Sequence, residues 1–281
     1  MNISEKLINS INNLPTLPTL YNVITEAIED PYSTNTKLAN IILTDQSTTM
    51  KVLKVANSPL YGFHGKIDSI SDAILYIGRN EIKNIVLTLS IISSFSKRIN
   101  LKGFRPIDLW AHSIAVGVIS RNIAQALGEK KLENYFLAGI LHDIGKIIFL
   151  EYAVEEYKKV FELAKKKEII INDAEKQILG INHEEIGQLL AKKWRIPETI
   201  QNVILYHSKG SILKTPDFLV SIVHLSNIIA HILELGYSGY DIIQQPSPII
   251  WDTLKIKKGM ITSLKDKIIN DYTNTVKLII L

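Results

Sequence analysis

Along most of the chain, hydrophobic residues recur at spacings of three and four, the pattern of helices that bury one face. We find no sustained alternation of apolar and polar residues, which would favour strands. The longer predicted helices cover Glu81–Ser96, Ile107–Leu127, Leu132–Gly145, Glu155–Glu168, Glu184–Lys193, Glu198–Tyr206 and Asp217–Leu235. Two isoleucine-rich stretches, Ile169–Ile171 and Leu278–Leu281, fit either helix or strand. The pattern therefore predicts an all-α fold.

Shorter helices are predicted in the first eighty residues. Ser69 precedes Asp72 by three positions, which resembles a capping box that begins a helix over Asp72–Ile77. Gly78 then fits the position just after the end of a helix.

Composition narrows the function classes. With 281 residues, 46% hydrophobic and 21% charged, the chain can form one large or two moderate domains. The net charge of +4 is too small to indicate nucleic-acid binding by itself. There is no cysteine, which excludes disulfides and thiolate metal sites, so a metal would need histidine and carboxylate ligands.

The sequence gives no sign of export or membrane insertion. The first fifteen residues are polar and do not resemble a secretory signal. No apolar stretch approaches the ~20 residues that a membrane-spanning helix needs. We therefore expect a cytoplasmic protein without a membrane partner.

The histidines are concentrated in one part of the chain, because six of the seven lie between residues 107 and 231. One of them forms the dipeptide His142-Asp143 at the end of a predicted apolar helix. Adjacent residues on a helix project about 100° apart, so this pair can share an ion only in a crevice between helices. Further ligands would have to come from other helices, and the candidates are His112, His183 and His207.

Imidazole and carboxylate ligands suit iron, zinc or manganese, and such an ion can polarise a phosphoryl oxygen and activate water. Lys146 could then contact a phosphate as a point charge. The alternative is a structural role, since most single histidines in helical proteins are core or surface residues. For His64, His224 and His231 we expect that structural role.

Several separated motifs identify a family resemblance. They are LPTLP (Leu14–Pro18), LANIILTDQSTTMKVLKVANSPLYG (Leu38–Gly62), ISDAILYIGRNEIKNIVL (Ile70–Leu87), and then His112, His142-Asp143, Gly145 and Lys146. In this order the motifs resemble the HDOD domain, a signalling-output relative of the HD phosphohydrolases. The similarity extends from about Leu14 to His207.

The resemblance implies an HDOD domain over residues 14–208. Within it, a helical subdomain at 14–100 would pack on an HD-like helical bundle at 105–235. Residues 236–281 would form a C-terminal helical extension.

The resemblance also implies a set of metal ligands. His112, His142 and Asp143 match the ligands of the HD superfamily, and Lys146 matches its phosphate-side lysine. Two later candidate ligands, His183 and His207, resemble the further histidines of the HD-GYP relatives.

At three positions the chain departs from these relatives. Asn227 stands where the last metal-binding aspartate is expected, and Ser208 stands where HD-GYP relatives have a second histidine. The residues after His183 are EEIGQLL, without the Gly-Tyr-Pro step. Loss of a carboxylate weakens binding of a hard cation, so we expect at most one divalent transition metal (iron, manganese or zinc) and no binuclear centre.

Three hypotheses of function follow. The leading one is a bacterial signal-transduction module that acts through contacts with an unidentified protein partner and has no catalytic activity. The alternative is a metal-dependent phosphohydrolase, a phosphodiesterase or nucleotide phosphatase. The third is nucleic-acid binding, since Ser71–Ser90 superficially resembles a helix-turn-helix. Its second helix is largely apolar, however, so we do not expect nucleic acid as a partner.

Overall fold

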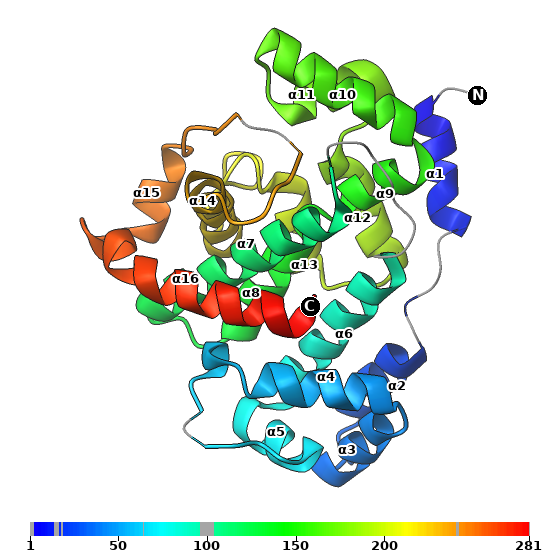
Figure 1. The fold of residues 1–281 in the computed structure, drawn as a ribbon, viewed down its shortest axis with the longest axis vertical. Helices are drawn as coiled ribbons and strands as arrows, with labels where there is room; N and C mark the ends of the chain where they lie inside the picture. The colour runs from blue at the N-terminus through cyan, green and yellow to red at the C-terminus, as the bar shows by residue number, and fades with distance from the viewer. Residues whose placement is uncertain are drawn as a thin grey trace. The chain divides into compact units, whose positions relative to one another are not determined.

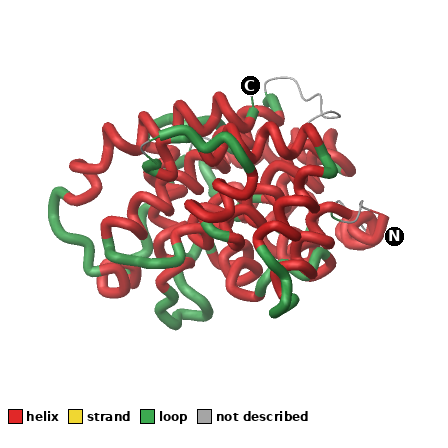
Figure 2. The backbone as a smooth tube through the Cα atoms, turned by 90° about the horizontal axis from the view of Figure 1, so that it is seen from below, coloured by secondary structure: helices red, strands yellow, loops and turns green. Residues whose placement is uncertain are grey.

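The computed structural model describes residues 3–13, 17, 19–63, 65–95, 104–239 and 242–280, and within these ranges the regular elements are helices (Figures 1 and 2). In these ranges β-structure consists of isolated β-bridges, such as that between Ile212 and Thr215. The predicted all-α class is confirmed. No helix in the described ranges is both long and apolar enough to cross a bilayer.

The chain divides into two units, which are described separately. The larger unit contains residues 1–15 and 98–265, and the smaller unit contains residues 16–97 and 266–281. The predicted domain boundaries at 14–208 and 236–281 remain a prediction. Predictions for His64, for the end of the helix at Ser96 and for most of the LPTLP motif fall outside the described residues.

Six helical elements and the end of a seventh form the smaller unit. They are α2 (Thr19–Glu29), α3 (Asn35–Leu43), α4 (Gln46–Ala56), the 3-10 helix η1 (Pro59–Tyr61), α5 (Ile70–Ile77), α6 (Arg79–Phe95) and the later part of α16 (Met260–Ile279). The Ser69 side chain caps α5 by accepting a hydrogen bond from the Asp72 backbone N–H, as predicted, although α5 begins two residues earlier than expected. The apolar residues that the sequence placed in the core of α6, among them Ile82 and Val86, are buried.

The larger unit contains the remaining helices. They are α1 (Ile3–Asn13), α7 (Pro106–Ala126), α8 (Leu132–Leu141), α9 (Ile144–Tyr152), α10 (Val154–Lys167), α11 (Ile171–Leu179), α12 (His183–Lys193), α13 (Glu198–Tyr206), α14 (Phe218–Ile232), α15 (Ile249–Leu254) and the beginning of α16. Helix α7 is buried along most of its length and packs against α8 and α14. Helix α12 packs against α9 and α13, so α7, α8, α9, α12, α13 and α14 form the core of this unit.

One predicted helix is wrong in a way that matters for the site. The stretch Leu132–Gly145 is not one helix, because α8 ends at Leu141 and α9 begins at Ile144. Asp143 has φ −101° and ψ 13°, outside helical geometry, so the chain turns there. His142 and Asp143 therefore lie in a break between two helices instead of on one helical face.

Glycines allow the helices on both sides of this break to approach closely. A Cβ on Gly139 of α8 would lie 2.5 Å from the Cα of Gly117 in α7, so only a hydrogen fits there. A Cβ on Gly145 of α9 would collide with the backbone oxygen of His183 at the start of α12. The dipeptide is thus held between two contacts in which backbone meets backbone.

We predict that Gly139→Ala lowers the free energy of unfolding by about 2–4 kcal/mol because the new methyl group must separate α8 from α7. In an unconstrained helix the same change would stabilise by about 0.5–1 kcal/mol. Urea denaturation of the wild-type and variant proteins measures the difference in their free energies of unfolding. The control is Gly128→Ala, where a Cβ meets no atom but φ is +85°, and where we expect a cost near 1 kcal/mol. A neutral or stabilising Gly139→Ala would contradict the close contact.

Candidate metal centre

The carboxylate of Asp143 is the centre of a buried polar cluster in the larger unit. Its Oδ2 lies 2.6 Å from Lys146 Nζ and 3.3 Å from His142 Nε2. Its Oδ1 lies 3.3 Å from His183 Nε2 and 3.6 Å from His207 Nε2. The two oxygens therefore face different partners, and the Asp143 residue is only 3% exposed.

Three of the histidines have their tautomer fixed by backbone carbonyls or by a carboxylate. His142 Nδ1 lies 2.7 Å from the Gly139 carbonyl oxygen, and His207 Nδ1 lies 3.1 Å from that of Ile204. Carbonyl oxygens only accept hydrogen bonds, so each Nδ1 carries a proton and donates it. In the neutral rings the Nε2 atoms then have free lone pairs, and these Nε2 atoms lie 3.3 and 3.6 Å from Asp143 oxygens.

His183 is oriented by a residue that the sequence did not reveal. Its Nδ1 lies 2.7 Å from Glu175 Oε2, which also accepts the His183 backbone N–H at 2.9 Å. The other Glu175 oxygen accepts a hydrogen bond from the Tyr157 hydroxyl at 3.0 Å. This carboxylate holds the ring so that Nε2 faces Asp143, as outer carboxylates do for metal-binding histidines. Glu175 lies on α11, eight residues before His183, and no local motif connects the two.

His112 and Asn227 are also in the cluster, but they bond to each other. His112 Nε2 lies 2.9 Å from Asn227 Oδ1. Whichever way the amide is turned, that hydrogen bond engages Nε2 of the His112 ring. The position where the resemblance implies a carboxylate therefore contains a neutral group paired with one of the expected ligands.

The donor atoms form two groups that share Asp143. One group is His112, His142 and Asp143, and the other is Asp143, His183 and His207; within each, the donor atoms lie within 4.8 Å of one another. Every one of these side chains is buried. His142 Nε2 is buried and makes no hydrogen bond within the described residues. Imidazole lone pairs that face a carboxylate repel it unless a cation or proton lies between them, so the donor set fits a divalent transition metal.

Lys146, predicted as a phosphate contact, is itself buried in the cluster. Its ammonium pairs with Asp143 Oδ2 and lies 3.4 Å from the backbone oxygen of Ser238. Lys146 therefore forms a buried ion pair with Asp143 and partly neutralises its carboxylate.

The chain after α14 covers the cluster. A Cβ on Gly236 would collide with the backbone nitrogen of His112, so this segment lies directly on α7. The Tyr237 backbone N–H donates a hydrogen bond to the backbone carbonyl oxygen of Asp108 at 3.0 Å. Ser238 is fully buried, and its hydroxyl lies 3.3 Å from His231 Nε2. Residues 236–238 therefore separate the His112 side of the cluster from solvent.

The two other described histidines differ in their relation to the cluster. We expected a structural role for His231, but the centroid of its ring lies 4.7 Å from that of His112, so it borders the cluster. His224 has the expected structural role: its Nδ1 donates to the His207 carbonyl, and its Nε2 accepts the Ser247 N–H.

Burial and neighbouring charges shift the protonation equilibria. Burial disfavours the charged form of Asp143, but the charges of His142 and Lys146 outweigh it and hold the pKa well below its usual range. Burial lowers the pKa of His112 and of His207 well below the ordinary value. For His183, burial acts in the same direction, but Glu175 outweighs it and raises the pKa. The cluster therefore combines an ionised carboxylate with neutral rings at His112 and His207, whereas a metal would have to displace a proton from His183.

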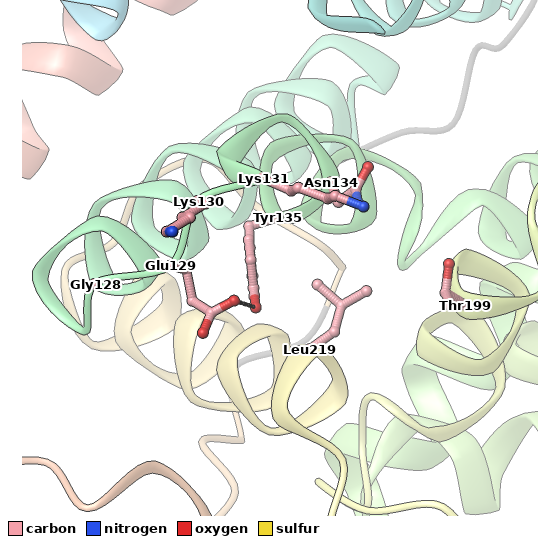
Figure 3. Close-up of a pocket in the computed structure, with 8 residues that line it drawn as sticks. All are labelled: Gly128, Glu129, Lys130, Lys131, Asn134, Tyr135, Thr199 and Leu219. Carbon is pink, nitrogen blue, oxygen red and sulfur yellow. Dashed lines mark hydrogen bonds between the residues drawn. The ribbon is translucent and has the colours of Figure 1, made fainter.

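A surface cavity of about 490 Å³ lies elsewhere in the larger unit (Figure 3). It is lined by Gly128–Lys131, Asn134, Tyr135, Thr199 and Leu219. Glu129 accepts a hydrogen bond from the Tyr135 hydroxyl at 2.8 Å, and the lysines are exposed. None of the clustered histidines lines this cavity, so it is separate from the candidate metal centre.

We predict that the metal-free protein loses stability as the pH falls from 7 to 5. Burial lowers the pKa values of His112, His207, His224 and His231, the last to about 4. The unfolded chain protonates these histidines near pH 6.5 while the folded protein does not, so their stabilisation is present above that pH and is lost below it. His183, with its raised pKa, contributes in the opposite direction, but only above the pKa of the unfolded chain, so it does not offset the loss below about pH 6.5.

The measurement is urea denaturation in the presence of a chelator at several pH values. The slope of the free energy of unfolding against pH should be smaller in His231→Gln by about 1.4 kcal/mol per pH unit, which is the contribution of one histidine. An identical slope in the wild-type and variant proteins would show that His231 is not held neutral.

Comparison with solved structures places this fold among known proteins. An HDOD domain protein of unknown function from Geobacter sulfurreducens is 27% identical, with a TM-score of 0.81 over 99% of this chain and 98% of that one. A proposed phosphohydrolase from Shewanella amazonensis is 21% identical, with a TM-score of 0.76 over 97% of each chain. A proposed signal transduction protein from Marinobacter aquaeolei is 17% identical, with a TM-score of 0.73 over 99% of this chain and 61% of that one.

Sequence comparison gives the same assignment. An uncharacterised protein from Treponema pallidum is 24% identical over 206 residues, which are 73% of this chain but only 39% of that protein. The chain thus spans less than half the length of this curated relative. The HDOD domain family model matches residues 14–209, most of the chain. The chain therefore belongs to the HDOD domain family.

Proposed function

We propose that this protein is a regulatory module of bacterial signal transduction that acts through protein contacts and binds one divalent transition metal in the group formed by Asp143, His183 and His207. The metal has a structural or sensory role in this proposal. The observation that carries it is the convergence of two oriented imidazoles on one ionised carboxylate in a buried site.

Burial favours a regulatory role over hydrolysis. A phosphohydrolase must admit a charged phosphate ester to its metal, yet the three ligand residues are at most 3% exposed. Residues 236–238 cover the neighbouring side through bonds to α7 and to Lys146. Catalysis would require these contacts to open in each turnover.

Two features favour this group over the one that contains His112. The Nε2 of His112 is engaged by Asn227, whereas the Nε2 atoms of His183 and His207 lie 3.4 Å from each other and both face Asp143. On the other side, Asp143 Oδ2 is already compensated by Lys146 at 2.6 Å. A cation near Oδ1 therefore meets less competition and two oriented nitrogen donors.

The donor set suits iron(II), manganese or zinc, which accept imidazole and carboxylate together. When bound, such an ion would supply a fixed positive charge to Asp143. The chain's own residues would prepare the site: Glu175 holds the His183 ring, and the Ile204 carbonyl holds the His207 ring. The ion would then connect the turn before α9 with the start of α12 and the end of α13, so occupancy would stiffen the packing of these helices.

A second candidate function is metal-dependent phosphohydrolysis. The observation that favours it is that two groups of donor atoms share Asp143, because a carboxylate between two metal sites is suited to a two-metal clamp on a phosphate. In that case Lys146 would leave Asp143 and contact the phosphate.

Metal titration of untagged, chelator-treated protein should give one ion per chain. His207→Gln should weaken binding at least about 100-fold, because even outer partners of metal ligands contribute about 10–100-fold. Glu175→Gln should weaken binding by about 10–100-fold through loss of the His183 orientation. The matched control is His112→Gln, which we expect to change the affinity less than about threefold, because that ring nitrogen is already bonded. Equal losses in His112→Gln and His207→Gln would contradict the assignment.

Hydrolysis of bis(p-nitrophenyl) phosphate and of a nucleoside monophosphate by the metal-loaded protein tests the regulatory role. We expect rates far below the roughly 1–1000 per second of typical enzymes. Turnover within that range, abolished by His142→Gln, would instead establish the phosphohydrolase.

Asn227→Asp restores a carboxylate beside His112 and should add a second metal per chain.

A further inference from the structure

A cavity of about 720 Å³ lies in the smaller unit, outside the candidate metal centre. Met50 and Leu53 of α4 line it, together with Pro59 and Ile67 from the segment that follows α4 and Leu278 of α16. The volume is within the range of about 300–1,000 Å³ that small-molecule sites occupy. These side chains give the cavity a largely apolar lining.

Hydrogen bonds fix one wall of the cavity. The Asn57 amide donates to the backbone oxygens of Leu53 and Ile67, both at 2.8 Å. Its own oxygen accepts the Ile67 backbone N–H at 2.8 Å. These bonds tie the residues around Ile67 to the end of α4, so the cavity is formed in the absence of a ligand.

Ser58 brings an unused hydrogen-bonding group to this cavity. The residue lines the cavity and is 3% exposed, and its hydroxyl has no hydrogen-bond partner in the part of the chain that the structure describes. It also precedes η1 without capping it. A buried hydroxyl without a partner costs about 1–3 kcal/mol, so its presence needs a reason.

The charge around the cavity is positive. Lys54 and Lys277 line it and are exposed, and neither has an ion-pair partner among the described residues. Lys66, which also lines it, pairs with Asp68 at 2.7 Å. Two ammonium groups therefore remain to attract an anion beside an apolar lining.

We propose that this cavity binds a small organic anion, with an apolar body against the lining of Met50, Leu53 and Leu278 and a carboxylate or phosphate group near Lys54 and Lys277. The Ser58 hydroxyl, which is covered in the ligand-free cavity, turns about its Cα–Cβ bond to hydrogen-bond the ligand. The site is independent of the metal centre and gives the module a direct chemical input. Helix α16, which supplies Lys277, has residues in both units, so a ligand here contacts a helix that the two units share.

The test uses 8-anilinonaphthalene-1-sulfonate, which has an apolar body with one anionic group, and its uncharged analogue N-phenyl-1-naphthylamine. Fluorescence titration should show tighter binding of the anionic dye, and this binding should weaken as salt screens the lysines. The double variant Lys54→Gln/Lys277→Gln should weaken it about fivefold. The control Lys158→Gln/Lys159→Gln, on exposed positions of α10, makes the same charge change and should have no effect.

Ser58→Ala separates a ligand contact from a structural role. It should weaken dye binding about threefold while leaving the melting temperature unchanged or higher, because it removes a buried hydroxyl without a partner. Displacement of the dye by octanoate or by phenyl phosphate distinguishes the two anionic groups. Equal affinity for the two dyes, equal losses in the two double variants, or displacement by neither anion would overturn the proposal.

Discussion

The buried negative charge of Asp143 is the constraint on which the larger unit depends. Removing a carboxylate from water costs several kcal/mol unless charges or hydrogen bonds replace the lost hydration. Here Lys146 provides a full charge to one oxygen, and three imidazoles face the two oxygens. Each of these partners comes from the turn before α9 or from an adjoining helix end, so the packing of α8, α9, α12 and α13 is inseparable from this charge.

The backbone geometry that brings these partners together comes from residues without side chains. Gly139 and Gly145 flank the turn that contains His142 and Asp143, and each meets the backbone of another helix. Close helix contacts on both sides bring the start of α12, with His183, next to the carboxylate. The same close packing leaves the ligands inaccessible to solvent, which connects the way the site is built with the regulatory role we propose.

Much of the fold could be predicted from the sequence, because amphipathic spacing and caps such as Ser69 are local signals. The break at His142-Asp143 could not, since the apolar pattern continues through it and the turn depends on tertiary contacts of Asp143. The likeness to a family indicated most of the clustered residues. It gave no sign of Glu175, whose role comes from the packing of α11 beside α12, nor of Lys146 as the internal partner of Asp143.

We propose that one metal ion binds between Asp143, His183 and His207. Anomalous X-ray diffraction from crystals grown with manganese or zinc, recorded on both sides of the absorption edge, tests it most directly. We expect a single anomalous peak, bounded by these three side chains, with the His112–Asn227 hydrogen bond intact. A peak beside His112, a pair of peaks that share Asp143, or no peak in crystals soaked at millimolar metal would contradict it.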